Sequence, residues 1–271
     1  MSNLVEDIYK YLESYSEVSP EAANELAQTL TDVIVLKLSN FREPSLSMSS
    51  VGKPPRKLYM DLHNVTRPDG QSRLKFLYGD IIEAVVLWLC KQAGHTVTDQ
   101  QKTVEVDGVK GSIDAIIDGV LCDVKSCSGQ SFKKFKNGTL PTQDSFGYLP
   151  QISGYRTCLK QEAAPFFLAV DKVTGEIATY FPDPDFDLPN IHKVIETAKK
   201  ASSEYPAEPC AQPVAFGKSG NEVVASCCKY CPHLFKCFPN AKEYKYSTGS
   251  EYFTKIVKEP RPRTEKELNN D

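Results

Sequence analysis

One hairpin constrains the fold of this chain more than any other part of its sequence. Two apolar segments, residues 109–117 and 120–126, are separated only by Asp118 and Gly119. This dipeptide favours the left-handed backbone angles of a two-residue turn. The sequence therefore predicts two short antiparallel strands that meet at Asp118 and Gly119.

Charged residues interrupt both strands of this hairpin. Asp114 lies in the first strand, and Asp123 and Lys125 lie in the second. Because side chains alternate along a strand, Asp123 and Lys125 point to one face and Val124 to the other. Carboxylates in apolar strands are costly to desolvate unless they bind something, and a divalent metal with its water is the usual ligand. The alternative is a hairpin whose charged face simply lies in solvent.

Composition and charge limit the class of protein. The chain has 271 residues, of which 41% are hydrophobic and 25% charged, and its net charge is -3. These values describe a globular protein with one large domain, or one domain and a small appendage. They exclude a protein that coats nucleic acid by bulk positive charge, so DNA binding would need a local basic groove. With no apolar run long enough for a membrane span and no signal-peptide core, we expect a cytoplasmic protein without a membrane partner.

Periodicity along the chain predicts alternating helices and strands. Helices are expected at residues 3–13, 20–38, 73–92, 150–162 and 190–204, and further strands near 97–106, 166–170 and 176–180. Residues 41–64 show no period and are predicted to form an extended arm, in which Lys53 and Arg56 suit phosphate contacts. A solvated linker is the alternative for this segment.

Basic and aromatic residues alternate in the polar segment 128–149. Lys133, Lys134 and Lys136 stand beside Phe132 and Phe135. Such a pattern suits a segment that grips a nucleic-acid backbone and stacks bases. A solvated loop is the competing interpretation.

Four motifs occur in a fixed order around the hairpin. They are Glu83 on the helix 73–92, Gly111-x-x-Asp114, Asp123-x-Lys125, and Gln151-x-x-x-Tyr155 on the helix 150–162. This order resembles the RecB-like branch of the PD-(D/E)XK nuclease superfamily over residues 72–180. The stretch from Cys210 to Cys237 resembles the C-terminal segment of phage-encoded exonucleases of that superfamily. The resemblance implies an α/β fold with a restriction-endonuclease-like core, in which helices flank a mixed central sheet.

The resemblance also implies a metal site for phosphodiester hydrolysis, because divalent metals can activate water and stabilise both the phosphate and the leaving oxygen. Asp114 and Asp123 supply hard oxygen ligands suited to Mg²⁺ or Mn²⁺. Glu83 would complete the shell directly or through water, and the main-chain carbonyl of Val124 is a further ligand in the family. Asp80 is the rival of Glu83, but Glu83 lies deeper in the apolar stretch.

The remaining motif residues have implied roles around the metal. Lys125 would orient or deprotonate the attacking water and stabilise developing charge. Gln151 and Tyr155, four residues apart on one helix face, would organise the site and contact the DNA backbone, with helix packing as the alternative for Tyr155. Gly111 is expected where the chain passes close to another backbone or to DNA. Arg156, on the same helix, is a predicted DNA-binding residue.

Cysteines crowd a second region near the C-terminus. Cys228-x-x-Cys231 is followed by Cys237, and in a reducing compartment this crowding indicates a metal rather than disulfides. Iron-sulfur members of the family show a similar pattern, but their fourth ligand precedes the nuclease core, and no cysteine here precedes Cys90. Cys210 is the nearest fourth candidate, followed by Cys227 and His233. Cys210, Cys228, Cys231 and Cys237 would suit structural Zn²⁺, with a 4Fe-4S cluster and an empty thiol cluster as alternatives.

The sequence thus predicts four regions and one function. Residues 1–70 form a helical region and basic arm, 71–205 the nuclease core, 206–254 a Cys-rich metal knuckle, and 255–271 a flexible tail. The resemblance implies a metal-dependent DNA exonuclease, and it alone suggests a role in phage or mobile-element DNA recombination, repair or degradation, in the host cytoplasm if phage-encoded. Its expected partners are DNA and a recombination or single-strand-binding protein, and oligomerisation is left open. A structure-selective endonuclease and a non-catalytic DNA-binding subunit on the same scaffold are the alternatives.

Overall fold

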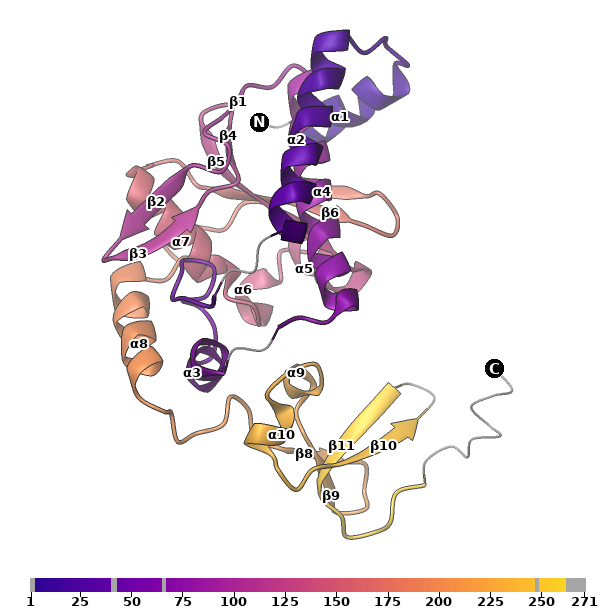
Figure 1. Ribbon diagram of the computed structural model, residues 1–271, viewed down its shortest axis with the longest axis vertical. Helices are drawn as coiled ribbons and strands as arrows, with labels where there is room; N and C mark the ends of the chain where they lie inside the picture. Colours follow the sequence, from indigo (N-terminus) through magenta and orange to yellow (C-terminus); the bar gives the residue numbers. More distant parts are fainter. Residues whose placement is uncertain (1–2, 40–42, 65–66, 247–248, 262–271) are drawn as a thin grey trace. The chain divides into compact units, whose positions relative to one another are not determined.

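The computed structural model describes residues 3–39, 43–64, 67–246 and 249–261 (Figure 1). The chain divides into a first unit, residues 1–53 and 61–200, and a second unit, residues 54–60 and 201–271. Within the described ranges, no helix combines the length and apolar character needed to cross a membrane.

A five-stranded mixed sheet forms the centre of the first unit, in the order β1-β4-β5-β6-β7. β5 pairs in parallel with β6, and the other neighbouring strands pair antiparallel. Helices flank this sheet, so the prediction of an α/β fold with a mixed central sheet is confirmed. The strands are β1 (Val97–Thr98), β4 (Ala115–Ile117), β5 (Val120–Cys127), β6 (Phe166–Asp171) and β7 (Ile177–Tyr180).

The predicted hairpin turns at Asp118 and Gly119, both of which have positive φ, between the antiparallel strands β4 and β5. Its first strand is interrupted, because β3 (Val109–Ser112) pairs with β2 (Thr103–Val106) in a separate two-stranded ribbon. Asp114 lies in the break between β3 and β4. The prediction of one continuous strand over residues 109–117 is therefore wrong.

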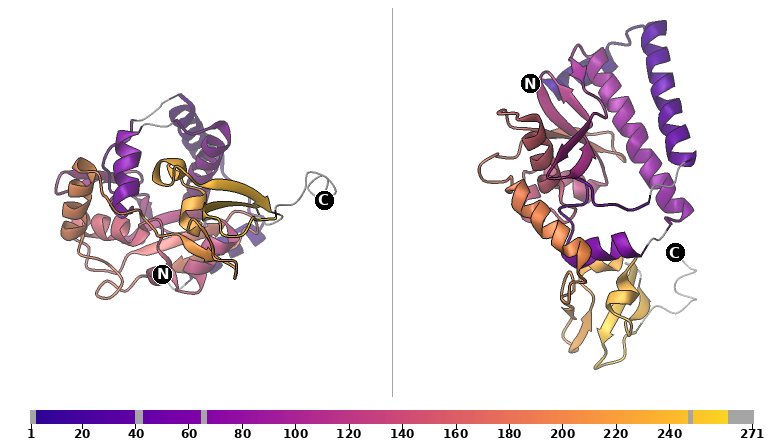
Figure 2. Two further views of the ribbon diagram at one scale, coloured as in Figure 1. Left: turned by 90° about the horizontal axis from the view of Figure 1, so that it is seen from below. Right: turned by 60° about the vertical axis from the view of Figure 1, so that its left-hand side comes forward.

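Helices cover both faces of the central sheet (Figure 2). On one face, α1 (Leu4–Glu13) and α4 (Gly70–Gln92) bury a shared apolar cluster with β4, β5 and β6. Because strand side chains alternate, Phe167 points to the opposite face, where it packs against Phe135 of α5 (Gly129–Lys136). α7 (Tyr148–Leu159) packs against β5 and β2.

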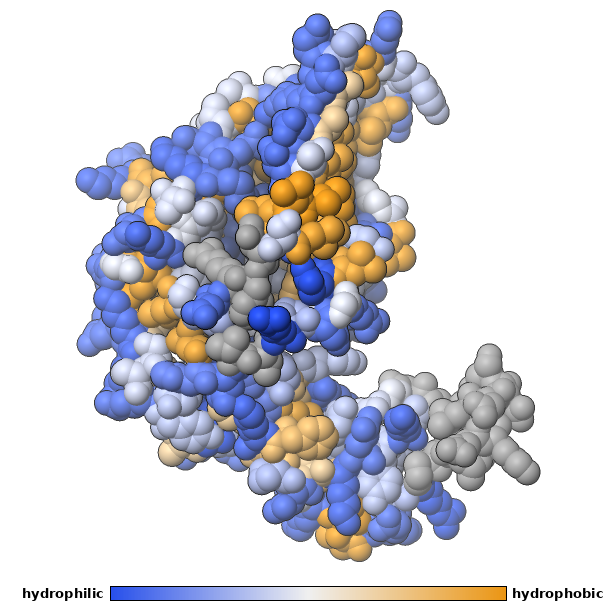
Figure 3. Space-filling view, viewed as in Figure 1, coloured by the Kyte–Doolittle hydropathy of each residue, from blue (hydrophilic) through white to orange (hydrophobic). Residues whose placement is uncertain are grey.

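Helix α2 (Pro20–Ser39) lies alongside α4 (Figure 2). Trp88 of α4 donates its indole N–H to the carbonyl oxygen of Ala22 at 2.9 Å. No described residue of α2 is fully buried, and Val35, Leu36 and Leu38 are exposed. Figure 3 shows an apolar surface patch over α2.

Two segments predicted to be irregular contain helices. Residues 55–63 of the predicted arm form α3 (Pro55–His63), whose first position suits a proline, while residues 41–42 lie outside the described residues. The predicted loop 128–149 contains α5 and α6 (Leu140–Gln143). Phe132 and Phe135 lie on one face of α5 and are buried, so the prediction that they stack bases is wrong.

The second unit is built on an antiparallel sheet in the order β10-β11-β9-β8. Val224, Cys228 and Leu234 form its buried cluster. Of the predicted flexible tail, residue 255 ends β11 and residues 262–271 lie outside the described residues. The elements from α8 onward are α8 (Ile191–Ser203), β8 (Val214–Phe216), β9 (Asn221–Val223), α9 (Ser226–Lys229), α10 (Leu234–Cys237), β10 (Lys242–Tyr246) and β11 (Gly249–Lys255).

Candidate active site

Asp123 and Lys125 form an ion pair on strand β5. The Lys125 Nζ lies 2.5 Å from Asp123 Oδ2, and Asp123 is fully buried. Among the described residues, the Asp123 carboxylate has no hydrogen-bonding partner besides this ammonium. The alternation predicted from the sequence thus places both charges together inside the protein, where a carboxylate is costly to desolvate.

Asp114 reaches the same strand from the break between β3 and β4. Its Oδ2 accepts a hydrogen bond from the backbone N–H of Val124 at 2.7 Å. This bond fixes Asp114 beside Asp123, because Val124 is the next residue along β5. The break also turns the chain there: Gln101 donates its backbone N–H to the carbonyl oxygen of Asp114 at 3.3 Å.

Glu83 comes to the site from α4. Its Oε1 accepts a hydrogen bond from Gln101 Nε2 at 2.6 Å. Gln101 has a φ of 55°, a left-handed conformation that is uncommon for residues other than glycine. Asp80, the rival candidate on the same helix, instead pairs with Lys37 of α2 at 2.9 Å.

The three carboxyl groups share an environment that disfavours negative charge. Burial raises the pKa of Glu83 to about 7. The Gln101 hydrogen bond acts to lower this pKa, and the nearby Asp123 charge acts to raise it. Burial, Asp123 and Glu83 hold the pKa of Asp114 well above its ordinary value. Burial also raises the pKa of Asp123, with Lys125 acting in the opposite direction. Although burial acts to lower it, Asp123 and Asp114 raise the pKa of Lys125 above its ordinary value.

The donor set fits Mg²⁺ or Mn²⁺ in its chemistry. Glu83, Asp114 and Asp123 offer hard carboxylate oxygens, and the buried Asp123 oxygens lack neutral hydrogen-bond donors within the described structure. Among the described residues, however, no three His, Cys, Asp or Glu side chains are arranged to hold a metal ion. Lys125 and Gln101 instead engage Asp123 and Glu83. A metal on Asp123 would therefore have to compete with the Lys125 ammonium, whereas the Gln101 hydrogen bond occupies only Oε1 of Glu83.

Gln151 and Tyr155 continue the polar chain from Lys125. Gln151 Oε1 accepts from Lys125 Nζ at 3.4 Å, and Gln151 Nε2 lies 3.2 Å from the Tyr155 hydroxyl oxygen, to which it donates. The Tyr155 ring is buried and lies against Gly111, where an added Cβ would be 2.7 Å from Tyr155 Cε1 and 2.6 Å from Met48 Cβ. Within this structure, the close approach expected at Gly111 is to side chains.

Most of the predicted DNA-binding residues contact other protein groups within the described structure. Lys53 pairs with Asp61 at 2.8 Å, and Arg156 donates to the carbonyl oxygens of Glu162 and Ala163. Lys134 donates to the Gln143 carbonyl oxygen at 2.9 Å, and Lys133 is exposed. Arg56 lies in the second unit, where it donates to the carbonyl oxygens of Pro206 and Ala207 and stands over the Tyr205 ring.

The cysteines of the second unit are electrostatic neighbours. Burial, then Cys227, Cys231 and Cys210, raise the pKa of Cys228 to about 12. Burial, then Cys237, Cys231 and Cys227, raise that of Cys210. The Sγ atoms of Cys227 and Cys228 are 3.9 Å apart. Burial, together with repulsion between neighbouring thiolates, explains why these thiols favour the protonated state when no cation is beside them.

Comparison with known proteins gives no family assignment. No protein-family model matches the chain, and no curated protein sequence matches it.

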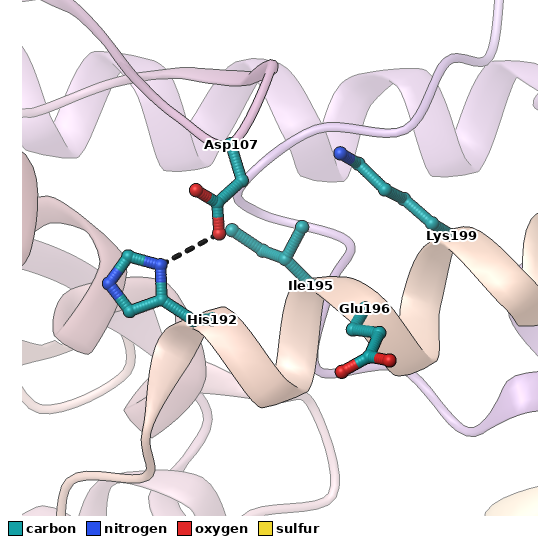
Figure 4. A pocket seen from close by; sticks show the side chains of 5 residues that line it. All are labelled: Asp107, His192, Ile195, Glu196 and Lys199. Carbon is teal, nitrogen blue, oxygen red and sulfur yellow. Dashed lines mark hydrogen bonds and ion pairs between the residues drawn. The ribbon is translucent and has the colours of Figure 1, made fainter.

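A pocket of about 430 Å³ lies apart from the motif residues, between the β2–β3 turn and α8 (Figure 4). Its lining includes none of the predicted site residues. His192 Nδ1 lies 2.7 Å from Asp107 Oδ2, and both side chains are exposed. The lining residues are Asp107, His192, Ile195, Glu196 and Lys199.

Two residues that contact the site are absent from the set predicted from the sequence. Gln101 holds Glu83, and the Tyr148 ring faces Lys125, whose Nζ lies 4.6 Å from the ring centroid. Gln101 belongs to no periodic pattern, and a glutamine in the sequence does not indicate a left-handed backbone conformation. Tyr148 lies outside the Gln151-x-x-x-Tyr155 motif, but it is one helical turn before Gln151, and that spacing was a usable signal.

Proposed function

We propose that this protein is a divalent-metal-dependent deoxyribonuclease of the PD-(D/E)XK type, with exonuclease activity. The proposal is supported by the convergence of Asp114, Asp123 and Lys125 at strand β5. The Val124 N–H holds the Asp114 carboxylate, and Asp123 and Lys125 form a buried ion pair. Such perturbed groups in one place are typical of catalytic sites.

In this function, Asp114, Asp123 and the Val124 carbonyl would hold Mg²⁺ or Mn²⁺, with Glu83 as a direct or water-mediated ligand. When bound, the metal supplies positive charge for the phosphate and lowers the pKa of a water molecule. Its charge would also offset the repulsion that raises the pKa values of the carboxyl groups.

Lys125 remains protonated in this environment, because Asp123 and Asp114 stabilise its charge. In its ammonium form it would orient the attacking water and stabilise negative charge on the phosphate. Gln151 accepts from Lys125 and donates to Tyr155, so these two residues set the direction of the ammonium.

Exonuclease activity is preferred over endonuclease activity because of the resemblance to phage-encoded members of the superfamily. The proposed setting is DNA recombination, repair or degradation in the cytoplasm, that of the host if the gene belongs to a phage. A recombination or single-strand-binding protein is the proposed partner. The second unit is proposed to bind structural Zn²⁺ through Cys210, Cys228, Cys231 and Cys237, with a 4Fe-4S cluster as the alternative.

The test is a cleavage assay with Mg²⁺ or Mn²⁺ on end-labelled linear DNA and on closed circular DNA. The proposal predicts that linear DNA is degraded, that circles survive, and that a chelator stops the reaction. Asp123→Asn should abolish cleavage, while the matched variant Asp107→Asn, in the β2–β3 turn, should retain it. Cutting of circles would identify an endonuclease, and no cutting of either substrate would support a non-catalytic DNA-binding subunit.

A further inference from the structure

Phe146 is an exposed aromatic ring beside the candidate site. Its side chain is 56% exposed, and its ring is stacked on Tyr148 with centroids 5.5 Å apart and planes 20° apart. Single exposed apolar residues are common on protein surfaces, so exposure alone indicates nothing. What distinguishes Phe146 is the set of contacts behind it.

The stack connects solvent to the candidate catalytic lysine. Tyr148, beneath Phe146, presents its ring to Lys125 Nζ at 4.6 Å from the centroid. Tyr148 also contacts the buried rings of Phe135 and Phe167. The distances place the Phe146 ring no more than about 10 Å from the Lys125 ammonium, within reach of a base attached at or next to a phosphate held there.

The loop that carries Phe146 is fixed in place. The Asp144 carboxylate accepts hydrogen bonds from the backbone N–H groups of Gly147, Tyr148 and Leu149 at 2.9, 3.0 and 2.8 Å. Gly147 has a φ of 78° and lies so close to Gly52 that an added Cβ would be 2.6 Å from the Gly52 Cα. A ring held this way loses little conformational freedom when it binds a ligand.

A cation also stands near this loop. The Lys134 ammonium is 2.9 Å from the carbonyl oxygen of Gln143, three residues before Phe146. A ring for a base and ammonium groups for phosphates are the two elements of single-strand binding sites.

We propose that Phe146 is a stacking platform for an unpaired nucleobase next to the scissile phosphate, so that the substrate is single-stranded DNA or a frayed duplex end. This inference rests on the proposed nuclease function and deepens it. A base inside a duplex is already stacked on both faces and cannot use the platform, whereas a terminal or unpaired base offers a free face.

Phe181 provides a matched control. It is also an exposed phenylalanine, 43% accessible, stacked on a buried ring, with the Phe166 centroid at 5.1 Å and the planes 21° apart. Phe166, however, belongs to the apolar cluster on the other face of the sheet. Truncation of Phe181 therefore removes the same kind of ring without affecting the stack that ends at Lys125.

The test measures the affinity of the full chain for short fluorescent single-stranded oligonucleotides, with Ca²⁺ in place of Mg²⁺ to prevent cleavage. A second set carries abasic nucleotides at one or the other end. Phe146→Ala and Phe146→Leu should weaken binding of the intact oligonucleotide at least about fivefold. Phe146→Trp should bind the intact oligonucleotide as wild type does, and Phe181→Ala should leave the affinity unchanged. The oligonucleotide that is abasic at the bound end should bind wild type and Phe146→Ala with equal affinity.

The inference is overturned if Phe146→Ala binds intact DNA like wild type, or if its loss of affinity persists on both abasic oligonucleotides. Cleavage with Mg²⁺ is measured in parallel, so that the two proposals can fail separately. If wild type cleaves DNA and Phe146→Ala binds it with unchanged affinity, only the stacking platform is refuted. If DNA binding depends on Phe146 and on the base but no cleavage occurs, only the nuclease function is refuted. If the protein neither binds nor cleaves DNA, both proposals are refuted.

Discussion

Lys125 and Asp123 form a buried ion pair between neighbours two positions apart on one strand, with 2.5 Å between Nζ and Oδ2. Their side chains are 15% and 1% exposed, so each charge depends on the other for its stabilisation. Removing one member leaves a buried charge without its partner, which is more costly than removing both.

Lys125→Met is therefore expected to abolish cleavage and to lower the free energy of unfolding by about 3 kcal/mol at neutral pH. The double variant Asp123→Asn, Lys125→Met should recover most of that stability while remaining inactive. Denaturant unfolding of the wild type, both single variants and the double variant measures the coupling. A destabilisation of the double variant equal to the sum of the two single effects would show that the pair is not coupled.

Glu83 is expected to make the metal-free protein less stable as the pH rises. Its pKa is raised from 4.5 to about 7, so the folded protein retains a proton that the unfolded chain has already released. Folding stability must then fall between about pH 4.5 and 7, by up to roughly 3 kcal/mol. Unfolding curves in chelator at several pH values, for wild type and Glu83→Gln, isolate this contribution. A difference between the two proteins that does not change with pH would contradict it.

Gln101 is expected to tune the metal affinity of Glu83. Gln101→Ala removes the hydrogen bond that favours the charged carboxylate, and loss of such an outer partner weakens metal binding about tenfold or more. Titration calorimetry with Mn²⁺ measures this directly, and Gln100→Ala is the control, since Gln100 is an exposed glutamine at the adjacent position. The idea fails if both variants bind Mn²⁺ with the same affinity as wild type.

Two glycines should respond to alanine with opposite signs. At Gly111 a Cβ would meet Met48 Cβ and Tyr155 Cε1 below 3 Å, so Gly111→Ala should cost about 1–3 kcal/mol of stability. Gly79 lies within α4 with no atom within 4 Å of an added Cβ, so Gly79→Ala should gain about 0.5–1 kcal/mol. Denaturant midpoints of the two variants check both signs, and a tolerant Gly111 would contradict the packing described around it.

The hairpin turn and the alternation of helices and strands could be predicted from the sequence, because they follow from short-range patterns. The mixed sheet and the motif residues were implied by the family resemblance instead. The sequence did not anticipate the break at Asp114. That break depends on long-range backbone hydrogen bonds, from Ile113 to Lys102 and from Gln101 to Asp114. Nor did it anticipate helix α5, where Phe132 and Phe135 pack into the core. A short amphipathic helix and a basic, aromatic loop have the same composition, and only tertiary burial separates them.

Cys231 is expected to be a metal ligand of the second unit. The thiols of Cys210 and Cys228 are held near those of their neighbours, where a bound cation would favour the thiolate state. Cys231→Ser should therefore lower the zinc content of the purified protein and its melting temperature together, because metal binding contributes to folding. Cys158→Ser, on α7 of the first unit, should change neither. Elemental analysis for zinc and iron, paired with thermal unfolding, measures both effects. Protein that contains neither metal, with equal melting temperatures for the two variants, would exclude a metal site at these cysteines.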